Sequence, residues 1–325
     1  MANTWQQELE VAVTAVSTAA KLCRRVQSSA DFAELAKADR SPVTVADFGS
    51  QALVCREILA HFSTDLVIGE EGSEELRQTE QATLMNRVLT EVQKIVPDAT
   101  TDQVLAWIDA GDHRDPAERA WTLDPIDGTK GFLRGEQYAV ALALLIDGQV
   151  TVAAMACPNL ISGDGQHTGL LFTAVRGRGA NVRPLEHLEY IESVRVTETA
   201  SSQDAVLCES VESGHSDHGR SASLQSLLGI SKPSVRMDSQ AKYATVARGQ
   251  ADIYLRLPTS KGYQEKIWDH AAGCLVIEEA GGKVTDITGQ PLDFSRGSTL
   301  SSNSGIIATN GHLHAMVVAT IQNEG

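Results

Sequence analysis

The sequence lacks the features that mark membrane, secreted and nucleic-acid-binding proteins. No apolar run approaches the roughly 18 residues that a membrane-spanning helix needs. The first ten residues, MANTWQQELE, have neither the basic and apolar pattern of a signal peptide nor the arginines of a transit segment. Lysine and arginine number 27 against 42 acidic residues, and the net charge of −15 opposes binding to nucleic-acid backbones and anionic membranes. We therefore expect no nucleic-acid and no membrane partner. A small anion can still bind where metal ions or local cations reverse the field.

Cysteine is scarce as well. The five cysteines are odd in number, scattered, and without metal-ligand spacing: Cys23, Cys55, Cys157, Cys208 and Cys274. We expect reduced, mostly buried thiols in a cytoplasmic protein, with redox regulation as the alternative. Apolar and charged contents of 42% and 21% are typical of a globular protein, and 325 residues suffice for one large domain or two modest ones.

The first half of the chain combines helical periodicity with strands. Apolar residues at three- and four-residue steps predict a helix over 9–23, with Thr4 and Gln7 as a capping box, and a second helix over 47–59. The segment 75–118 is polar and acidic around one helical stretch, and we interpret it as a surface insertion. Strands are predicted at 66–68, 121–123, 138–146, 150–156, 170–175 and 190–196.

The strand over 138–146 carries the clearest pattern. It has large apolar residues or tyrosine at even positions and alanines at 139, 141 and 143, which predicts burial on both faces. Asp147 and Gly148 then predict a hairpin turn, so this sheet is at least partly antiparallel.

Strands and helices alternate after a polar stretch at 197–204. Strands are predicted at 205–208, 235–237, 251–257 and 306–309, and helices at 221–228, 241–248, 267–280 and 312–322. We therefore predict an α/β fold class with two domains: an α+β domain over 1–199 on an antiparallel sheet, and an α/β domain over 200–325, with sheets layered between helices.

Carboxylates at the ends of predicted elements carry the chemistry. In DPIDGT, Asp124 and Asp127 stand three apart where a strand meets a loop. Two carboxylates in a partly dry cleft repel, and one protonates unless a cation intervenes. All-oxygen ligation selects a hard cation such as Mg²⁺ or Mn²⁺. The alternative is a turn whose aspartates cap backbone amides.

Three other acids have matching positions. Glu70 follows a strand and a glycine, Asp47 begins a helix, and Asp269 opens the helix from Ala271 to Ala280. Each aspartate could alone be a plain helix cap. Together, oxygen ligands at several element ends are what a two-metal phosphoryl-transfer site needs, although spacing does not show that they converge.

Several strings resemble known families. GEE at 69–71, DPIDGT at 124–129 and WDHAAG at 268–273, in that order, resemble the lithium-sensitive inositol monophosphatase-like superfamily. SPVTVAD (41–47), DPIDGTKGFLRGEQYAVALAL (124–144), DSQAKY (238–243) and YLRLP…YQEKIWDHAAG (254–273) are similar to the 3′(2′),5′-bisphosphate nucleotidases. This resemblance extends to residue 286 and implies a layered αβαβα sandwich.

The resemblance also implies a ligand set. Glu70, Asp124 and the carbonyl of Ile126 would hold a first Mg²⁺, and Asp124, Asp127 and Asp269 a second. Thr129, paired with Asp47, would activate the attacking water together with Glu70. Mn²⁺ would replace Mg²⁺, while Li⁺ and Ca²⁺ would inhibit.

The substrate subsite follows from the same resemblance. The amides of Gly128 and Thr129 would contact the scissile phosphate. Residues matching the family's nucleotide-binding positions are His215, with His218 as a rival, Ser239, Lys242 and Arg256. Without the resemblance, Lys242 and Arg256 would be read as solvated surface charges.

These features predict a Mg²⁺-dependent phosphatase that hydrolyses the 3′-phosphate of adenosine 3′,5′-bisphosphate by two- or three-metal-assisted attack of water. The sulfated nucleotide, 3′-phosphoadenylyl sulfate, is a second expected substrate, and we expect a monomer. One alternative is an inositol polyphosphate 1-phosphatase, inositol monophosphatase or sugar phosphatase. TKGFLRGEQY after DPIDG argues against a simple inositol monophosphatase. The non-enzymatic alternative is a nucleotide sensor, which would not need Asp47, Glu70 and Thr129 to serve a water.

Overall fold

The computed structural model describes the chain except for residues 1–3, 30–44, 213–217, 259, 261 and 325. His215 and the first four residues of the string SPVTVAD therefore lie outside the described residues. Within the described residues, no helix is long and apolar enough to cross a bilayer. The five cysteines are buried and free, as predicted.

In the described part of the chain, seven strands form the larger sheet in the order of the sequence. They are β1 (Leu66–Gly69), β2 (Arg119–Asp127), β3 (Ala139–Ile146), β4 (Gln149–Ile161), β5 (Thr168–Val175), β6 (Ala180–Pro184) and β7 (Glu192–Val194). β1 and β2 are parallel, and the other neighbours are antiparallel. The predicted turn between β3 and β4 is present, with Asp147 and Gly148 at φ 49° and 74°.

The smaller sheet has the order β11-β12-β10-β8-β9 among the described residues. Its strands are β8 (Leu207–Glu209), β9 (Val235–Arg236), β10 (Ile253–Arg256), β11 (Lys283–Thr285) and β12 (Ile306–Thr309). β8 is parallel to β9 and β10, whereas β12 runs antiparallel to β10 and β11. β11 was missed in the sequence.

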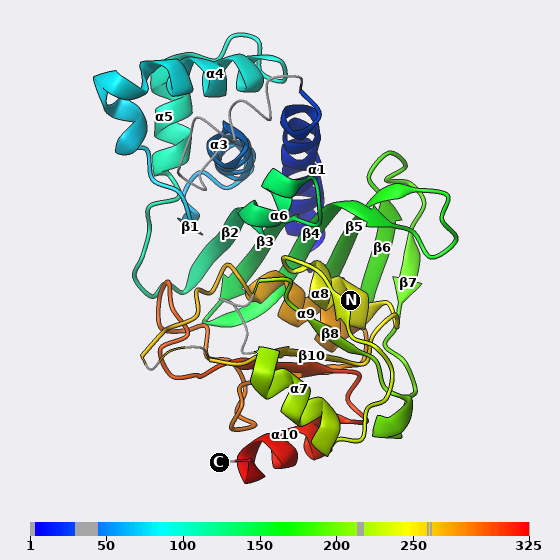
Figure 1. Ribbon diagram of the computed structural model, residues 1–325. Helices are drawn as coiled ribbons and strands as arrows, with labels where there is room; N and C mark the ends of the chain where they lie inside the picture. The colour runs from blue at the N-terminus through cyan, green and yellow to red at the C-terminus, as the bar shows by residue number, and fades with distance from the viewer. Residues whose placement is uncertain (1–3, 30–44, 213–217, 259, 261, 325) are drawn as a thin grey trace.

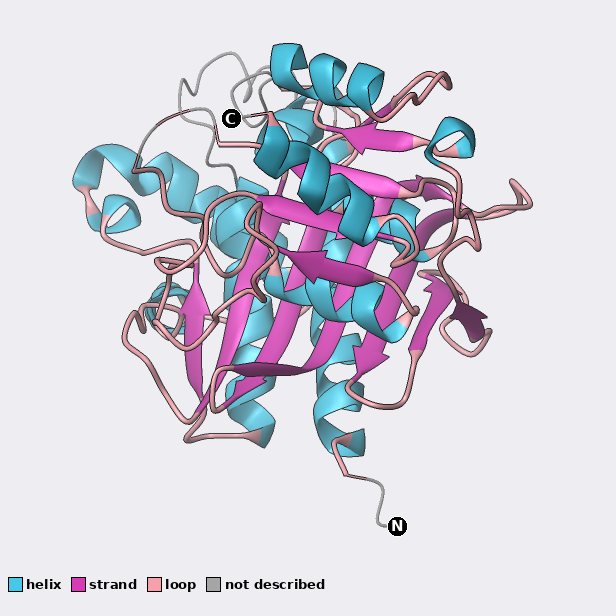
Figure 2. Ribbon diagram, turned by 90° about the horizontal axis from the view of Figure 1, so that it is seen from below, coloured by secondary structure: helices cyan, strands magenta, loops and turns pink. Residues whose placement is uncertain are grey.

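Helices and sheets alternate in five layers (Figures 1 and 2). One outer layer is α1 (Gln6–Gln27), α3 (Val45–His61), α4 (Ala82–Gln93) and α5 (Thr101–Asp109). α8 (Ala241–Ala247) and α9 (Ala271–Glu279) lie between the two sheets. α7 (His218–Leu227) and α10 (His314–Asn323) cover the far side of the smaller sheet. This is the predicted αβαβα sandwich.

β3 shows why the larger sheet is covered on both sides. Its large residues, such as Val140 and Leu142, belong to the core beneath α1 and α3. Ala139, Ala141 and Ala143 belong to the core that contains α8 and α9. The alanines leave room for the helical layer between the sheets, which is the close packing that the alternation predicts.

The segment 75–118 differs from its prediction. It forms two helices rather than one, α4 and α5, and both contribute to the core beneath α3 through Val88, Val92, Val104 and Ile108. α5 begins with a capping box at Thr100. The segment is therefore part of the outer helical layer and not only a surface insertion, because apolar residues of both helices are buried in the core that α3 shares.

Two local predictions are also corrected. α1 begins at Gln6, and its N-cap residue is Trp5, in the left-handed region and without a side-chain capping bond, so the predicted box at Thr4 is wrong. The strand predicted over 190–196 is the shorter β7, and β6 at 180–184 was not predicted, because the chain turns twice where the sequence suggested one turn.

The strands of the larger sheet precede residue 195 and those of the smaller follow residue 206. The division into two domains near residue 200 stays a prediction.

Candidate active site

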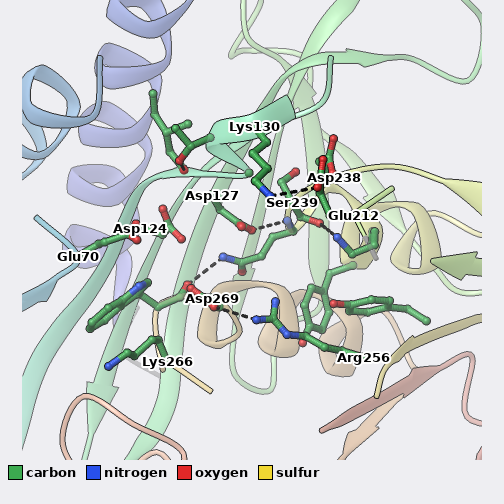
Figure 3. Close-up of a pocket in the computed structure, with 18 of the residues that line it drawn as sticks. Glu70, Asp124, Asp127, Lys130, Glu212, Asp238, Ser239, Arg256, Lys266 and Asp269 are labelled. Atoms are coloured by element: carbon green, nitrogen blue, oxygen red, sulfur yellow. Dashed lines mark hydrogen bonds and ion pairs between the residues drawn. The ribbon is translucent and has the colours of Figure 1, made fainter. Parts of the chain in front are cut away.

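A cavity of about 390 Å³ opens where both sheets and the inner helices meet. Figure 3 shows the side chains that line it. Ten predicted site residues are among them: Glu70, Asp124, Ile126, Asp127, Gly128, Thr129, Ser239, Lys242, Arg256 and Asp269. Asp47 does not line the cavity but lies buried in the first turn of α3, and its charge acts on Glu70. His215 is outside the described residues.

The parallel pairing of β1 and β2 brings the first acids together. Gly69 pairs with Leu123 in the register of the two strands. Glu70 and Asp124 are the next residues along the chain from this pair, so they lie side by side at the same end of the sheet. The register between β2 and β3 shifts between Asp124 and Asp127, and such an irregularity re-aims side chains at the end of a strand. Consequently both aspartates of DPIDGT face the cavity that Glu70 borders.

The four carboxylates surround a common space (Figure 3). The Glu70 side chain is exposed on the cavity side, while protein surrounds the rest of it. Loss of water around the carboxylate is the main cause that raises its pKa to about 8, and the charges of Asp269 and Asp47 add to it. Burial, followed by the charge of Glu70, raises the pKa of Asp124 well above its ordinary value. The pKa of Asp127 rises to about 6, mainly through burial and Asp269. Lys242 moderates that rise.

The donor set fits a hard divalent cation. Asp124 is 2% exposed, and its Oδ1 is a buried acceptor without a hydrogen-bond partner in the described structure. Buried acceptors normally find a partner, so an oxygen left open among acids is suited to a metal ion. Ile126 lines the same cavity, and its carbonyl accepts a hydrogen bond from the Thr129 hydroxyl at 3.3 Å. A carbonyl oxygen has two lone pairs, so this bond leaves one for a metal.

The loop after β2 leads into the short helix α6 (Thr129–Arg134). Gly128 precedes the helix with φ 85°, a conformation that suits glycine. A helix therefore begins directly behind DPIDG, and its first residues border the cavity. The pairing of Thr129 with Asp47 stays a prediction.

The two predicted cations are not solvated surface charges. Lys242 is 5% exposed, and its Nζ donates to the carbonyl of Ser239 at 2.8 Å. Burial lowers its pKa. The Arg256 guanidinium contacts Glu265 at 2.8 Å and Asp269 at 3.4 Å. A buried lysine and a partly buried arginine thus line one side of a cavity whose other side is acidic.

The comparisons with known proteins agree with this geometry. Residues 4–325 match the profile of the "Inositol monophosphatase family". The chain belongs to the inositol monophosphatase family. That family is metal-dependent, typically on Mg²⁺. A protein of Emericella nidulans named 3′(2′),5′-bisphosphate nucleotidase is 43% identical over 347 residues, with 98% of each chain covered.

Another protein with that name, from Schizosaccharomyces pombe, is 42% identical and covers 96% of this chain and 94% of its own. Among solved structures of the inositol monophosphatase family, the inositol monophosphatase from Anabaena has a TM-score of 0.63 at 23% identity, with 99% of this chain and 97% of that chain covered. The CysQ protein from Bacteroides thetaiotaomicron has a TM-score of 0.61 at 20% identity, with 94% and 98% covered. These two likenesses show the fold.

Sequence reasoning missed the residues that hold Arg256. Glu265 accepts from Arg256 and contacts Nε2 of His270 at 3.2 Å, and Nδ1 of His270 lies 2.8 Å from the Tyr243 hydroxyl. Burial alone would raise the pKa of Glu265, but the hydrogen bond and charge of His270, with Arg256, bring it down to about 2. Glu265 and His270 lie within the string YQEKIWDHAAG, but nothing in the sequence assigns them a role, since their spacing of five residues matches neither helix nor strand periodicity.

Proposed function

We propose that this protein is a metal-dependent 3′(2′),5′-bisphosphate nucleotidase that converts adenosine 3′,5′-bisphosphate to AMP and phosphate. The sulfated analogue, 3′-phosphoadenylyl sulfate, is a second substrate of the same site. The observation that carries the proposal is that four carboxylates, the buried Lys242 and the partly buried Arg256 line one cavity. The carboxylates suit metal ions at the scissile phosphate, and the cations suit a second phosphate that is not cleaved.

Two positions for Mg²⁺ are proposed. Glu70, Asp124 and the Ile126 carbonyl hold one ion, and Asp124, Asp127 and Asp269 hold the other, all from residues that line the cavity. Bound there, the ions neutralise charge on the phosphoryl oxygens and lower the pKa of a water. Glu70, Thr129 and Asp47 would orient the attacking water.

The substrate lies between the acids and the cations. The first residues of α6, Gly128 and Thr129, present backbone amides to the scissile phosphate, since both border the cavity. Lys242 and Arg256 bind the distal phosphate, with Ser239 beside them. Arg256 uses one nitrogen for Glu265 and Asp269, and a guanidinium has five N–H donors, so it retains donors for a phosphate. His215 completes the proposed subsite from outside the described residues.

The decisive experiment compares substrates in the parent protein, Lys242→Ala and Arg256→Ala. The parent should hydrolyse adenosine 3′,5′-bisphosphate far better than 3′-AMP, inositol monophosphate or inositol 1,4-bisphosphate. Each charge-assisted phosphate contact is worth about 1.5–3 kcal/mol, so each variant should lose about tenfold to a hundredfold in kcat/KM on the bisphosphate and much less on 3′-AMP.

Lys266→Ala is a matched control, because Lys266 lines the same cavity but lies over the Trp268 ring. Equal losses on bisphosphate and monophosphate would remove the distal-phosphate assignment. If an inositol phosphate is the best substrate, the inositol phosphatase alternative replaces this proposal. If adenosine bisphosphate binds without turnover in Mg²⁺, the protein is a nucleotide sensor.

Metal dependence is tested separately. Activity should require Mg²⁺ or Mn²⁺, and Ca²⁺ should suppress it, because Ca²⁺ takes longer bonds and looser geometry. Li⁺ should inhibit as well. Phosphate release is measured after chelation and re-addition of each ion, and full activity after exhaustive chelation would contradict the metal site. We also propose that the protein acts as a monomer in the cytoplasm, where its five buried thiols stay reduced.

A further inference from the structure

Gln240 makes an unusual set of contacts between the two halves of the acid cluster. Its side chain is 1% exposed. Its backbone N–H donates to the Asp127 carboxylate. Its side-chain Nε2 donates to the carbonyl of Trp268 at 2.9 Å, and its Oε1 accepts from the N–H of Gly273 at 3.0 Å. One residue therefore contacts Asp127 directly and holds both sides of Asp269.

The backbone at Gln240 is fixed by the turn before it. Ser239 has φ 66°, a left-handed conformation that is uncommon for a residue with a side chain. The turn presses closely on the loop after β2, because a Cβ at Gly128 would lie 2.9 Å from that of Ser239. The N–H of Gln240 is thereby aimed at Asp127, which stands just before this glycine.

The side-chain amide is needed in both of its functions. A carbonyl needs a donor and an N–H needs an acceptor, and neither an apolar side chain nor an ionised carboxylate of similar length supplies both. Asp127 and Asp269 carry like charges and lie close enough to raise the pKa of Asp127. Arg256 pairs with Asp269 and offsets part of this repulsion, and Gln240 joins both segments through buried hydrogen bonds.

We propose that Gln240 is a positioning residue that sets the separation of Asp127 and Asp269 and so the affinity of the second metal position. This inference rests on the proposed function, because it takes those aspartates as metal ligands. Outer partners that orient metal ligands typically contribute about tenfold to a hundredfold in metal affinity.

The test measures Mn²⁺ binding to the metal-free protein by electron paramagnetic resonance, without substrate. Gln240→Met keeps the length and removes both side-chain bonds, and Gln240→Asn keeps the amide but is one methylene too short to reach both partners. Each should raise the Mn²⁺ dissociation constant of the second position by about tenfold to a hundredfold. In assays, the KM for Mg²⁺ should rise while kcat recovers at saturating Mg²⁺.

Asn310→Leu is the matched control. Asn310 is also 1% exposed, and its amide donates to Thr197 and Thr199 and accepts from the N–H of Leu313, but it does not line the cavity. Asn310→Leu should lower the melting temperature, because it removes buried hydrogen bonds, and should leave the Mn²⁺ affinity unchanged.

The outcomes separate the two proposals. Parent-like Mn²⁺ affinity in folded Gln240→Met or Gln240→Asn overturns the inference, as does an equal loss of affinity in Asn310→Leu. A parent that binds no Mn²⁺ overturns it together with the metal site. If the parent binds Mn²⁺ and both Gln240 variants bind it more weakly, the inference is supported. If that same parent releases no phosphate, the proposed nucleotidase is rejected while the inference stands.

Discussion

Asp124 is the residue whose environment most requires a cation. It is buried, has an oxygen without a partner in the described structure, and faces Glu70 and Asp127. An ordinary buried carboxylate accepts hydrogen bonds or pairs with a base. Here the nearest charges are of the same sign, so the metal-free site is electrostatically strained.

Asp124→Asn and Asp127→Asn test this requirement for a cation. Each should lower kcat/KM by about a hundredfold or more, the scale of losing one group that stabilises developing charge. Each should leave the melting temperature of the metal-free protein unchanged or slightly higher, because a like charge is removed. Phosphate release and thermal unfolding are measured on the same samples. Asp98→Asn, at an exposed position, is the control. Near-normal turnover in either variant at saturating Mg²⁺ would reject the ligand assignment.

At the scale of elements, the packing of α8 on α9 sets the geometry of the cavity. α8 brings Lys242 and begins next to Gln240, and α9 follows Asp269. The two helices touch at Gly273, where an added Cβ would lie 2.4 Å from the ring of Tyr243. That ring is 1% exposed, and its hydroxyl contacts His270, so it has no space into which to move.

Gly273→Ala should therefore destabilise the protein. Overpacking of a filled core costs about 1–3 kcal/mol, which is expected as a lower free energy of unfolding in urea. Gly163→Ala is the control, because nothing lies within 4 Å of a Cβ there and its φ is outside the left-handed region. If Gly273→Ala and Gly163→Ala have equal free energies of unfolding, the prediction is contradicted, because α8 and α9 would then move apart without a loss of stability.

For the whole molecule, the acid cluster links stability to pH. Glu70 and Glu71 have pKa values of about 8 and about 9 in the folded protein against an ordinary 4.5, chiefly through removal from water. Above pH 4.5 the unfolded chain releases these protons and the folded chain keeps them. The folded state then binds more protons, so stability falls as pH rises through this window.

The metal-free protein should accordingly lose thermal stability between about pH 6.5 and pH 9. His314 acts mostly below this range, because burial lowers its pKa to about 4 and the unfolded histidine titrates near its ordinary 6.5. Mg²⁺ should raise the melting temperature, and by more at pH 9 than at pH 6.5, since the ionised carboxylates bind it. The measurement is a melting series with and without Mg²⁺. Glu71→Gln should show a shallower fall than the parent, and an equal or rising curve in the parent would contradict the linkage.

Local pattern was enough to predict much of this protein. The alternation in 138–146 predicted a strand with two different faces, and Asp147 and Gly148 predicted the turn after it, because both depend on neighbours along the chain. The family-like strings predicted residues that the structure brings to one cavity. Order along the chain suffices for such features, since β-sheet periodicity and turn conformation are local properties.

Tertiary structure decided what depends on contacts between distant residues. Read alone, Lys242 and Arg256 suggested solvated charges, and only the packing of α8 and β10 buries Lys242 and partly covers Arg256. α5 was missed because its apolar residues gain a partner only when α3 lies against them. Gln240 and Glu265 carry no periodic signal, because their roles come from bonds to residues that the fold brings beside them. The sequence by itself thus determined which chemical groups are present and the local conformation that carries them. Burial and electrostatic coupling among them, which depend on separations in space, came only with the tertiary structure.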